Sequence, residues 1–402
     1  MTLLAIVRKS LRQHALSTAV TSLSIALAGG LLMSVWAIKA QSQQTFTQIT
    51  GGFDAVLGAR SSKLQLVLNA VFHLEASPAN ISWKDYEDIK NNPSVSHAIP
   101  IAMGDNYHGY RIVGTQTNLF TDVEFAAGRK FRVEAPGRIF DPGLKEAVIG
   151  SFAARKLGLK RGDRFFPYHG LYFNEKEQHT NDQYVVVGVL EPSNTPADRV
   201  VWIPLAGVQN MTGHAAETAT DVSAVLVKLR SPMAGRTLEL LYNRQGDRLT
   251  FAWPIGATMG ELLNKISWFD RVLALIAYLV ALVAAGSILA SIYNSMNERR
   301  RQIAILRALG ARRATIFCTV VLEAVAIAVL GMMAAFALYG GITSAVAAVI
   351  RAQTGVVIDP FVWNPVLVLA PLGMIALGAL AGVVPAIKAY RTDVAEHLSP
   401  TT

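Results

Sequence analysis

The residues best placed for chemistry form one basic segment, residues 297–313, which lies between two long apolar stretches. Its apolar residues Ile303, Leu306 and Leu309 recur at helical spacing, arginines occupy the other positions, and Gly310 is placed to end the helix. Such a basic amphipathic helix can rest on anionic lipid headgroups. It can equally fill an apolar groove on a protein partner while its arginines meet acids, and the residues alone favour neither use.

Known catalytic motifs do not occur in the sequence. Nothing fits the Walker A pattern, the nucleophile elbow, the zinc-protease helix or the kinase signatures. We therefore predict no catalytic residues and no metal ligands, and we do not expect the chain to be an enzyme.

The histidines and aromatics between residues 39 and 268 allow two interpretations. The histidines lack the spacing of a ligand pair, which favours ordinary structural roles over a metal site; they are His73, His97, His108, His169, His179 and His214. Met103 and several aromatic residues could form an apolar surface for a lipid or peptide, or could belong to the core. The aromatic residues are Tyr107, Tyr110, Phe165, Phe166, Tyr168, Tyr172 and Phe173.

Glu323 is an acid inside an apolar stretch. An intramembrane carboxylate is a functional candidate by default. Its place near the arginine segment favours a structural role instead, paired with Arg307, Arg312 or an arginine of the N-terminal arm. One turn earlier, Cys318 is expected to be a small buried residue.

Composition indicates a membrane protein. The chain has 402 residues, 52% hydrophobic and only 16% charged, with a mean hydropathy of +0.34 and a formal net charge of +9. These values exclude intrinsic disorder, and the lone Cys318 excludes an intrachain disulfide.

Four stretches are long and apolar enough to span a bilayer: residues 15–38, 269–296, 314–348 and 362–387. The first could be a signal peptide, but its apolar part is too long and Lys39 occupies the place expected for cleavage, so we predict a retained anchor.

Residues 39–268 have a different pattern, with short β-type runs and helical stretches that predict a folded α+β domain. Strands are expected at 184–190, 200–203 and 223–229, and helices at 83–90 and 146–157.

The distribution of Lys and Arg predicts the orientation. Cations gather in the arm (1–14), the basic segment (297–313) and the tail (388–402), whereas the short loop 349–361 is balanced. Both termini are therefore expected in the cytoplasm and the large domain outside, so the net charge of +9 indicates topology and no nucleic-acid partner.

The basic segment resembles the cytoplasmic loop of the MacB/FtsX/LolC-LolE-like ABC transporter permeases of the mechanotransmission type. That loop carries an E-R-R-x-E-I-x-I-L-R-A-L-G-A-type stretch, and Gln302 replaces its second acid here. The matching residues are Glu298, Arg299, Arg300, Ile303, Ile305, Leu306, Arg307, Ala308, Leu309, Gly310 and Ala311. The tail from Pro385 to Leu398, Glu323, and the patterns at 127–129, 156–163 and 186–190 also resemble this family.

The resemblance implies a membrane α-helical fold with four transmembrane helices and a large α+β extracytoplasmic domain, a MacB-like periplasmic core, inserted between helices 1 and 2. It implies a permease of the bacterial inner membrane that forms a homodimer and works with an ABC ATPase. ATP binds that partner, and no cofactor is expected in this chain. The substrate would be hydrophobic, a peptide or a lipoprotein, and a periplasmic adaptor or substrate-binding protein is a further expected partner. The residues expected to couple to the ATPase are Glu298, Arg299, Arg300, Ile303, Leu306, Arg307, Leu309 and Gly310.

Two other functions are compatible with the sequence. One is an FtsX-like regulator of a periplasmic cell-wall hydrolase, although the larger outer domain favours transport. The other is an anchored sensor without an ATPase, which would have no need of the arginine-rich loop.

Overall fold

The structure is a computed structural model, and it describes residues 3–212, 220–298, 310–354 and 361–391, together with residues 305, 307, 357 and 359. The chain divides into two compact units. The helical unit comprises Met1–Gln41, Ile266–Ala347 and Asp359–Thr402, and the sheet unit comprises Ser42–Lys265 and Ala348–Ile358.

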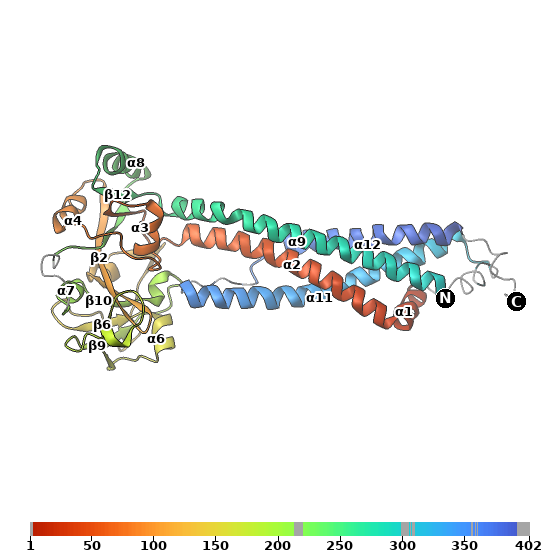
Figure 1. The fold of residues 1–402 in the computed structure, drawn as a ribbon, viewed down its shortest axis with the longest axis horizontal. Coiled ribbons are helices and arrows are strands. Elements are labelled where there is room, and N and C mark those ends of the chain that lie inside the picture. Colours follow the sequence, from red (N-terminus) through yellow and green to blue (C-terminus); the bar gives the residue numbers. More distant parts are fainter. Residues whose placement is uncertain are drawn as a thin grey trace. The chain divides into compact units, whose positions relative to one another are not determined.

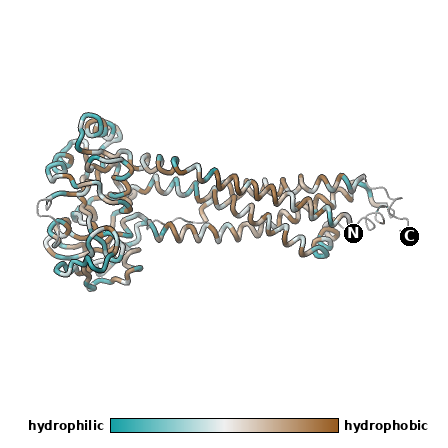
Figure 2. Tube along the Cα trace, viewed as in Figure 1, coloured by the Kyte–Doolittle hydropathy of each residue, from teal (hydrophilic) through white to brown (hydrophobic). Residues whose placement is uncertain are grey.

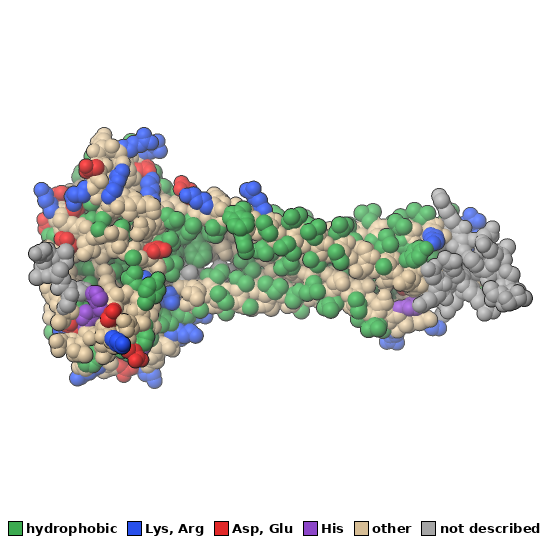
Figure 3. Space-filling model, in the orientation of Figure 1, with side chains coloured by type: hydrophobic (Ala, Val, Ile, Leu, Met, Phe, Trp, Pro, Cys, Tyr) green, Lys and Arg blue, Asp and Glu red, His purple; other side chains and the backbone are tan. Residues whose placement is uncertain are grey.

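The helical unit is built from long apolar helices (Figure 1). A short helix, α1 (Leu3–Gln13), precedes α2 (Ala15–Gln48), α9 (Ile255–Glu298), α11 (Arg313–Thr354) and α12 (Val366–Arg391). Among the described residues, the last four are long and apolar enough to cross a membrane. Hydrophobic residues follow these helices through their length (Figure 2), and hydrophobic side chains cover the visible face of their middle part (Figure 3).

Small residues let the helices pack closely. A Cβ on Gly331 of α11 would lie 2.6 Å from the Cβ of Ile25 in α2, and one on Gly382 of α12 would lie 2.5 Å from the Cβ of Ala324. Close backbone approach of this kind is how helices associate in lipid, where burial of apolar surface gives little driving force.

The sheet unit contains a mixed sheet of ten strands, counted over the described residues. The order is β12-β1-β11-β2-β3-β10-β6-β9-β7, and β8 pairs with β2. The pairs β3–β10 and β6–β9 are parallel and the others antiparallel. The strands are β1 (Ala55–Ala59), β2 (Val95–Tyr107), β3 (Tyr110–Thr115), β6 (Glu146–Ile149), β7 (Arg164–Phe165), β8 (Tyr168–His169), β9 (Tyr184–Val189), β10 (Val201–Pro204), β11 (Ala224–Leu229) and β12 (Leu249–Ala252).

Short helices and a separate hairpin complete the unit. The hairpin pairs β4 (Glu124–Ala126) with β5 (Arg129–Lys130). The helices are α3 (Lys63–Ala70), α4 (Trp83–Lys90), α5 (Asn118–Thr121), α6 (Ser151–Leu157), α7 (Leu205–Gln209), α8 (Pro232–Leu240), η1 (Glu175–Glu177), η2 (Pro196–Arg199) and η4 (Leu241–Gln245).

Both faces of the sheet are buried. Side chains alternate along a strand, so Ala55 and Leu57 of β1 join one hydrophobic core while Val56 joins the other. Strand β11 does the same, with Val225 and Val227 on one side and Leu226 on the other. This accounts for the near-continuous apolar runs in the sequence.

The predicted strands at 184–190, 200–203 and 223–229 are confirmed within one residue at each end, and so is the helix at 83–90. The predicted helix at 146–157 is wrong in its first part. Residues Glu146–Ile149 form β6, and the helix begins only after Gly150, whose extended backbone caps α6. All four residues of β6 are buried, so tertiary pairing in the sheet outweighs the local helical spacing.

Candidate functional site

The predicted coupling segment lies largely outside the described residues. Arg299, Arg300, Ile303, Leu306 and Leu309 are among those not described, and Glu298 is described only as the last residue of α9. Ile305 and Arg307 are helical, and the N–H of Gly310 donates to the carbonyl of Arg307 at 3.0 Å. Gly310 has φ +97°, a conformation that suits glycine and ends a helix.

Polar contacts join five helices among the described residues of the helical unit. We call these residues the helix-end cluster: Ser10, Ser17, Ser291, Tyr293, Arg313, Glu323, Lys388 and Tyr390. Its members link α1 to α11, α2 to α9, α9 to α12 and α11 to α12.

The most buried link of the cluster joins α1 to α11. The hydroxyl of Ser10 donates to Glu323, and the two residues are 1% and 6% exposed. On the same helix, Val7 is buried as well. Glu323 therefore faces protein, as a structural role requires, and one of its partners is a serine of the N-terminal arm.

The other links are more exposed. The hydroxyls of Ser17 and Ser291 lie 2.7 Å apart. Lys388 donates to the Tyr293 hydroxyl and its ammonium lies 4.3 Å from the centre of that ring, while the Arg313 guanidinium lies 5.8 Å from the ring of Tyr390. These contacts tie α9, which precedes the coupling segment in the chain, to α2 and α12, and α11, which follows it, to α12.

Cys318 is exposed, so its predicted burial is wrong. It lies between Ile316 and Val320, which face the core of the helical unit. On a helix, positions two residues away point in a different direction, so Cys318 is on the outer face of α11.

The far ends of three helices are built into the sheet unit. Helix α9 starts there with Ile255 and Met259, which are 1% and 4% exposed in one of the two sheet cores. A Cβ on Gly256 would lie 2.4 Å from the carbonyl oxygen of Thr47 in α2, and Phe46 packs on Phe72 with ring centres 5.8 Å apart.

The end of α11 is held by polar contacts. Arg199 of η2 donates to the carbonyl of Gln353 at 2.5 Å, and the side chain of Asn194 bonds both the N–H and the carbonyl of Val357. Helices α2, α9 and α11 each run without a break from the sheet unit into the helical unit.

Of the aromatic residues for which the sequence left core and surface roles open, some are buried and others are exposed. Phe165 is 2% exposed and packs on Tyr107 and Tyr184. Tyr172 is 84% exposed, and Phe173 lies beside Tyr168 at the rim of this aromatic group.

The sheet unit also has a pocket of about 170 Å³ beside the β4–β5 hairpin. Its lining combines two aromatic rings, three cations and one acid with small and polar residues: Phe125, Gly128, Arg129, Lys130, Phe131, Arg132, Glu191, Pro192 and Ser193. The Arg129 guanidinium lies 4.9 Å from the centre of the Phe125 ring. This mixed lining suits a ligand with both apolar and anionic groups.

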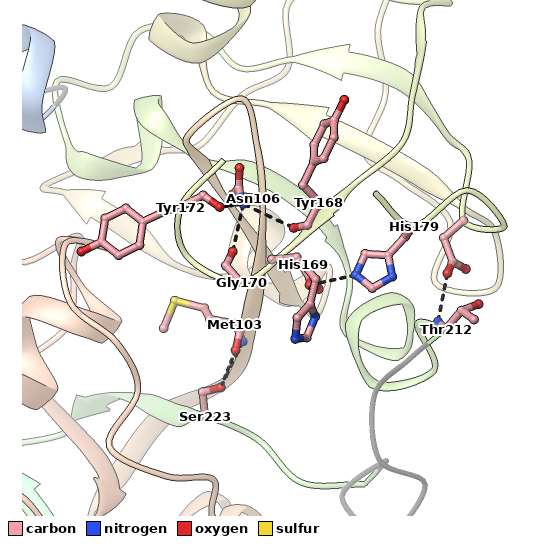
Figure 4. A network of polar contacts seen from close by, with 11 residues as sticks. Met103, Asn106, Tyr168, His169, Gly170, Tyr172, His179, Thr212 and Ser223 are labelled. Carbon is pink, nitrogen blue, oxygen red and sulfur yellow. Dashed lines mark hydrogen bonds and ion pairs between the residues drawn. The ribbon is translucent and has the colours of Figure 1, made fainter. Parts of the chain in front are cut away.

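Two of the histidines lie close together in the structure, although their spacing in the sequence did not indicate it. His73 is buried with its ring against Trp202, and burial and the nearby Arg111 lower its pKa to about 3. His169 and His179, by contrast, lie side by side with Asp105 (Figure 4). Sequence spacing missed this group, because β2 and β8 are brought together only by the sheet; His214 lies outside the described residues.

Comparison with known proteins agrees with this architecture. Residues 18–238 match the family described as MacB-like periplasmic core domain, and residues 274–394 match the family described as FtsX-like permease C-terminal. The chain belongs to the MacB/FtsX-like family of ABC transporter permeases. The predicted family and fold class are confirmed: four apolar helices, with a MacB-like core domain between the first and the second.

Two solved structures are similar to parts of this permease. The extracellular domain of the noncanonic ABC-type transporter YknZ from Gram-positive bacteria has 17% identity and a TM-score of 0.31, covering 49% of this chain and 99% of that one. The periplasmic region of MacB from Actinobacillus actinomycetemcomitans has 11% identity and a TM-score of 0.36, covering 54% of this chain and 94% of that one.

Proposed function

We propose that this permease converts ATP binding and hydrolysis by a partner ATPase into movement of its sheet unit, which drives export or extraction of a hydrophobic, peptide or lipoprotein substrate. The chain itself binds no nucleotide in this proposal, in keeping with the lack of a Walker A motif. The working unit is a homodimer in the bacterial inner membrane, with both termini in the cytoplasm and the sheet unit in the periplasm. A periplasmic adaptor or substrate-binding protein would meet the sheet unit.

The observation that carries the proposal is the continuity of α2, α9 and α11. Each has one end in a core or polar contact of the sheet unit and runs on into the helical unit, whose other end holds the helix-end cluster. Helix α9 has 44 residues, which corresponds to about 66 Å of unbroken helix. Such a helix can transmit displacement along its axis.

We assign the docking of the ATPase to the coupling residues: Glu298, Arg299, Arg300, Ile303, Leu306, Arg307, Leu309 and Gly310. They begin with Glu298, the last residue of α9, and α11 begins three residues after Gly310. In this proposal the apolar residues fill a groove on the ATPase and the arginines meet its acids or the lipid headgroups. A push on this segment would reach two of the three continuous helices at once.

The test changes one face of the segment at a time. Leu306→Asp places a charge in the apolar stripe, whereas Ala308→Asp places the same charge on the opposite face of a helix. In membranes that contain the partner ATPase, Leu306→Asp should lose co-purification and permease-dependent ATP hydrolysis, and Ala308→Asp should keep both. Unchanged co-purification and activity in Leu306→Asp would overturn the docking role.

A further inference from the structure

A corner of the sheet unit brings three metal-binding side chains together. Asp105 of β2 and His169 of β8 are directly opposed in the antiparallel pairing of these strands. His179 comes from the chain that follows β8 and returns past it (Figure 4). One Asp105 carboxylate oxygen lies 3.2 Å from Nε2 of His179 and 3.3 Å from Nδ1 of His169.

These distances are those of ligands around a tetrahedral ion. With bonds of 2.0–2.1 Å, as zinc makes to histidine nitrogen, neighbouring donors lie about 3.3–3.4 Å apart. One donor atom from each of the three residues lies within 4.8 Å of the others. We propose that Asp105, His169 and His179 bind a divalent transition-metal ion, with Zn²⁺ as the reference ion. The inference is independent of the proposed coupling to an ATPase.

The ligand set defines the class of ion. Two imidazoles and one carboxylate suit Zn²⁺, Co²⁺, Ni²⁺ or Cu²⁺, whereas Ca²⁺ and Mg²⁺ prefer oxygen ligands. Three protein ligands leave a fourth position for water or another donor. The side chain of His169 is 50% exposed, so this position can be reached from solvent.

The two inner ligands are held firmly by their surroundings. The Asp105 side chain is fully buried. The β2–β3 register shifts between Met103 and Asp105, so Asp105 is the first paired residue after the shift. His179 is 9% exposed; its N–H donates to the carbonyl of Pro167 at 2.9 Å, and its carbonyl accepts from Asp182. A preorganised ligand pair of this kind reduces the ordering that binding requires.

The third ligand is positioned by a neighbour of Asp105. The side-chain amide of Asn106 donates to the carbonyls of Tyr168, Gly170 and Tyr172, at 3.4, 3.0 and 3.1 Å (Figure 4). These three carbonyls surround His169 in the chain, so β2 supplies both a ligand and the support for the loop that carries another. Outer partners of this sort orient metal ligands and raise affinity.

The competing explanation is a purely structural cluster, in which both imidazoles hydrogen-bond to one carboxylate. The two explanations differ in what the purified protein binds. The full-length chain, purified in detergent without a polyhistidine tag and stripped with a chelator, is titrated with Zn²⁺ against a competing dye. A parallel titration with Co²⁺ records the visible ligand-field absorption that protein nitrogen ligands produce.

The main variant is His169→Ala, because this half-exposed side chain can be removed with little effect on folding. The control is His97→Ala, which removes a half-buried histidine from the same strand at a position paired with Lys228, outside the cluster. A second variant, Asp105→Asn, keeps the size of the buried side chain and removes its charge. Circular dichroism checks that each variant is folded.

We expect the unaltered chain and His97→Ala to bind one Zn²⁺ per chain and to give the Co²⁺ band. His169→Ala and Asp105→Asn should bind more than about tenfold more weakly and lose the band, since even supporting residues contribute 10–100-fold. The proposal is overturned if the unaltered chain binds no stoichiometric Zn²⁺. It is also overturned if His169→Ala binds Zn²⁺ as tightly as His97→Ala does.

Discussion

The two units of this permease use apolar residues in opposite ways. In the sheet unit, large apolar side chains such as Leu57 and Phe251 are fully buried on the two faces of the sheet. In the helical unit, residues such as Leu279 and Leu282 of α9 are more than half exposed. The difference indicates that the sheet unit has apolar cores of its own, whereas the helical unit needs lipid or another chain around it.

The two units also differ in how contacts are made. The sheet unit is held by long-range strand pairing and two packed cores, and the helical unit by close approach at small residues and by the polar links of the helix-end cluster. Four changes test this contrast, from the largest expected effect to the smallest.

The largest effect on the free energy of unfolding should come from shortening a leucine to alanine, once in each unit. Leu57→Ala opens a cavity in a sheet core and should lower the free energy of unfolding by about 2–5 kcal/mol. Leu279→Ala removes the same atoms from an exposed position and should cost less than about 1 kcal/mol. Thermal unfolding followed by near-UV circular dichroism measures both; equal losses would contradict the difference between the units.

Glycines of the helical unit give the next comparison. Gly331→Ala forces a Cβ against Ile25 and the carbonyl of Ser22, and overpacking should destabilise the unit by about 1–3 kcal/mol. At Gly286 of α9 an added Cβ meets nothing within 4 Å, so Gly286→Ala should be neutral or stabilising. The unfolding temperature in detergent compares the two, and a stable Gly331→Ala protein would refute the close α2–α11 approach.

A smaller effect is expected in the helix-end cluster. Ser10→Ala removes a donor from the buried carboxylate of Glu323 and should cost about 1–2 kcal/mol. Ser24→Ala, where the exposed hydroxyl bonds only its own helix at 3.1 Å, is the control and should stay within about 0.5 kcal/mol. If both serines behave alike in thermal unfolding, the Ser10–Glu323 contact does not stabilise the helical unit.

The smallest effect is a pH dependence in the sheet unit. Burial first, and then Arg111, lower the pKa of His73 to about 3, from an ordinary value of 6.5. Between these values the unfolded chain binds the proton and the folded chain does not, so stability falls as the pH falls below 6.5. The slope of stability against pH from this group approaches about 1.4 kcal/mol per pH unit. The stability lost at pH 5.5, relative to high pH, is about 1.4 kcal/mol.

His73→Asn removes this group and tolerates its backbone, which has φ +55°. Unfolding temperatures measured from pH 7 to pH 5 should therefore fall less in the variant than in the unaltered chain. Identical pH profiles would show that His73 takes up its proton in the folded state as readily as in the unfolded state.

The sequence predicts those helices and strands that are determined by residues close together in the chain. Long apolar stretches with little or no charge identify the four long helices, and short runs rich in β-branched residues identify β9, β10 and β11. The helix at 146–157 shows the limit, because local spacing favoured a helix where the sheet required a strand at Glu146–Ile149.

Contacts between distant residues could not be predicted. Ser10 and Glu323 are 313 residues apart. The sequence offered an arginine of the N-terminal arm as one partner for Glu323, but nothing in it marks Ser10. Asp105 and His169 meet only because β2 and β8 pair in one register, and a shift of one residue would turn one of them to the other face. Cys318 was assigned to the core from its residue type, although its position between Ile316 and Val320 on α11 directs it outward.

The central claim is that a partner ATPase moves the sheet unit through the continuous helices, and one distance measurement tests it most directly. Cys318, the only native cysteine, is replaced by Ala, and a spin label is attached at Met233→Cys, a position on α8 that is 75% exposed. Label-to-label distances in the proposed homodimer, reconstituted with the proposed ATPase, are recorded without nucleotide and after trapping with ATP and vanadate.

The account predicts that trapping shifts the distance distribution in this background and in Ala308→Asp, and that Leu306→Asp abolishes the shift. An unchanged distribution while the ATPase is active, or a full shift in Leu306→Asp, would contradict it.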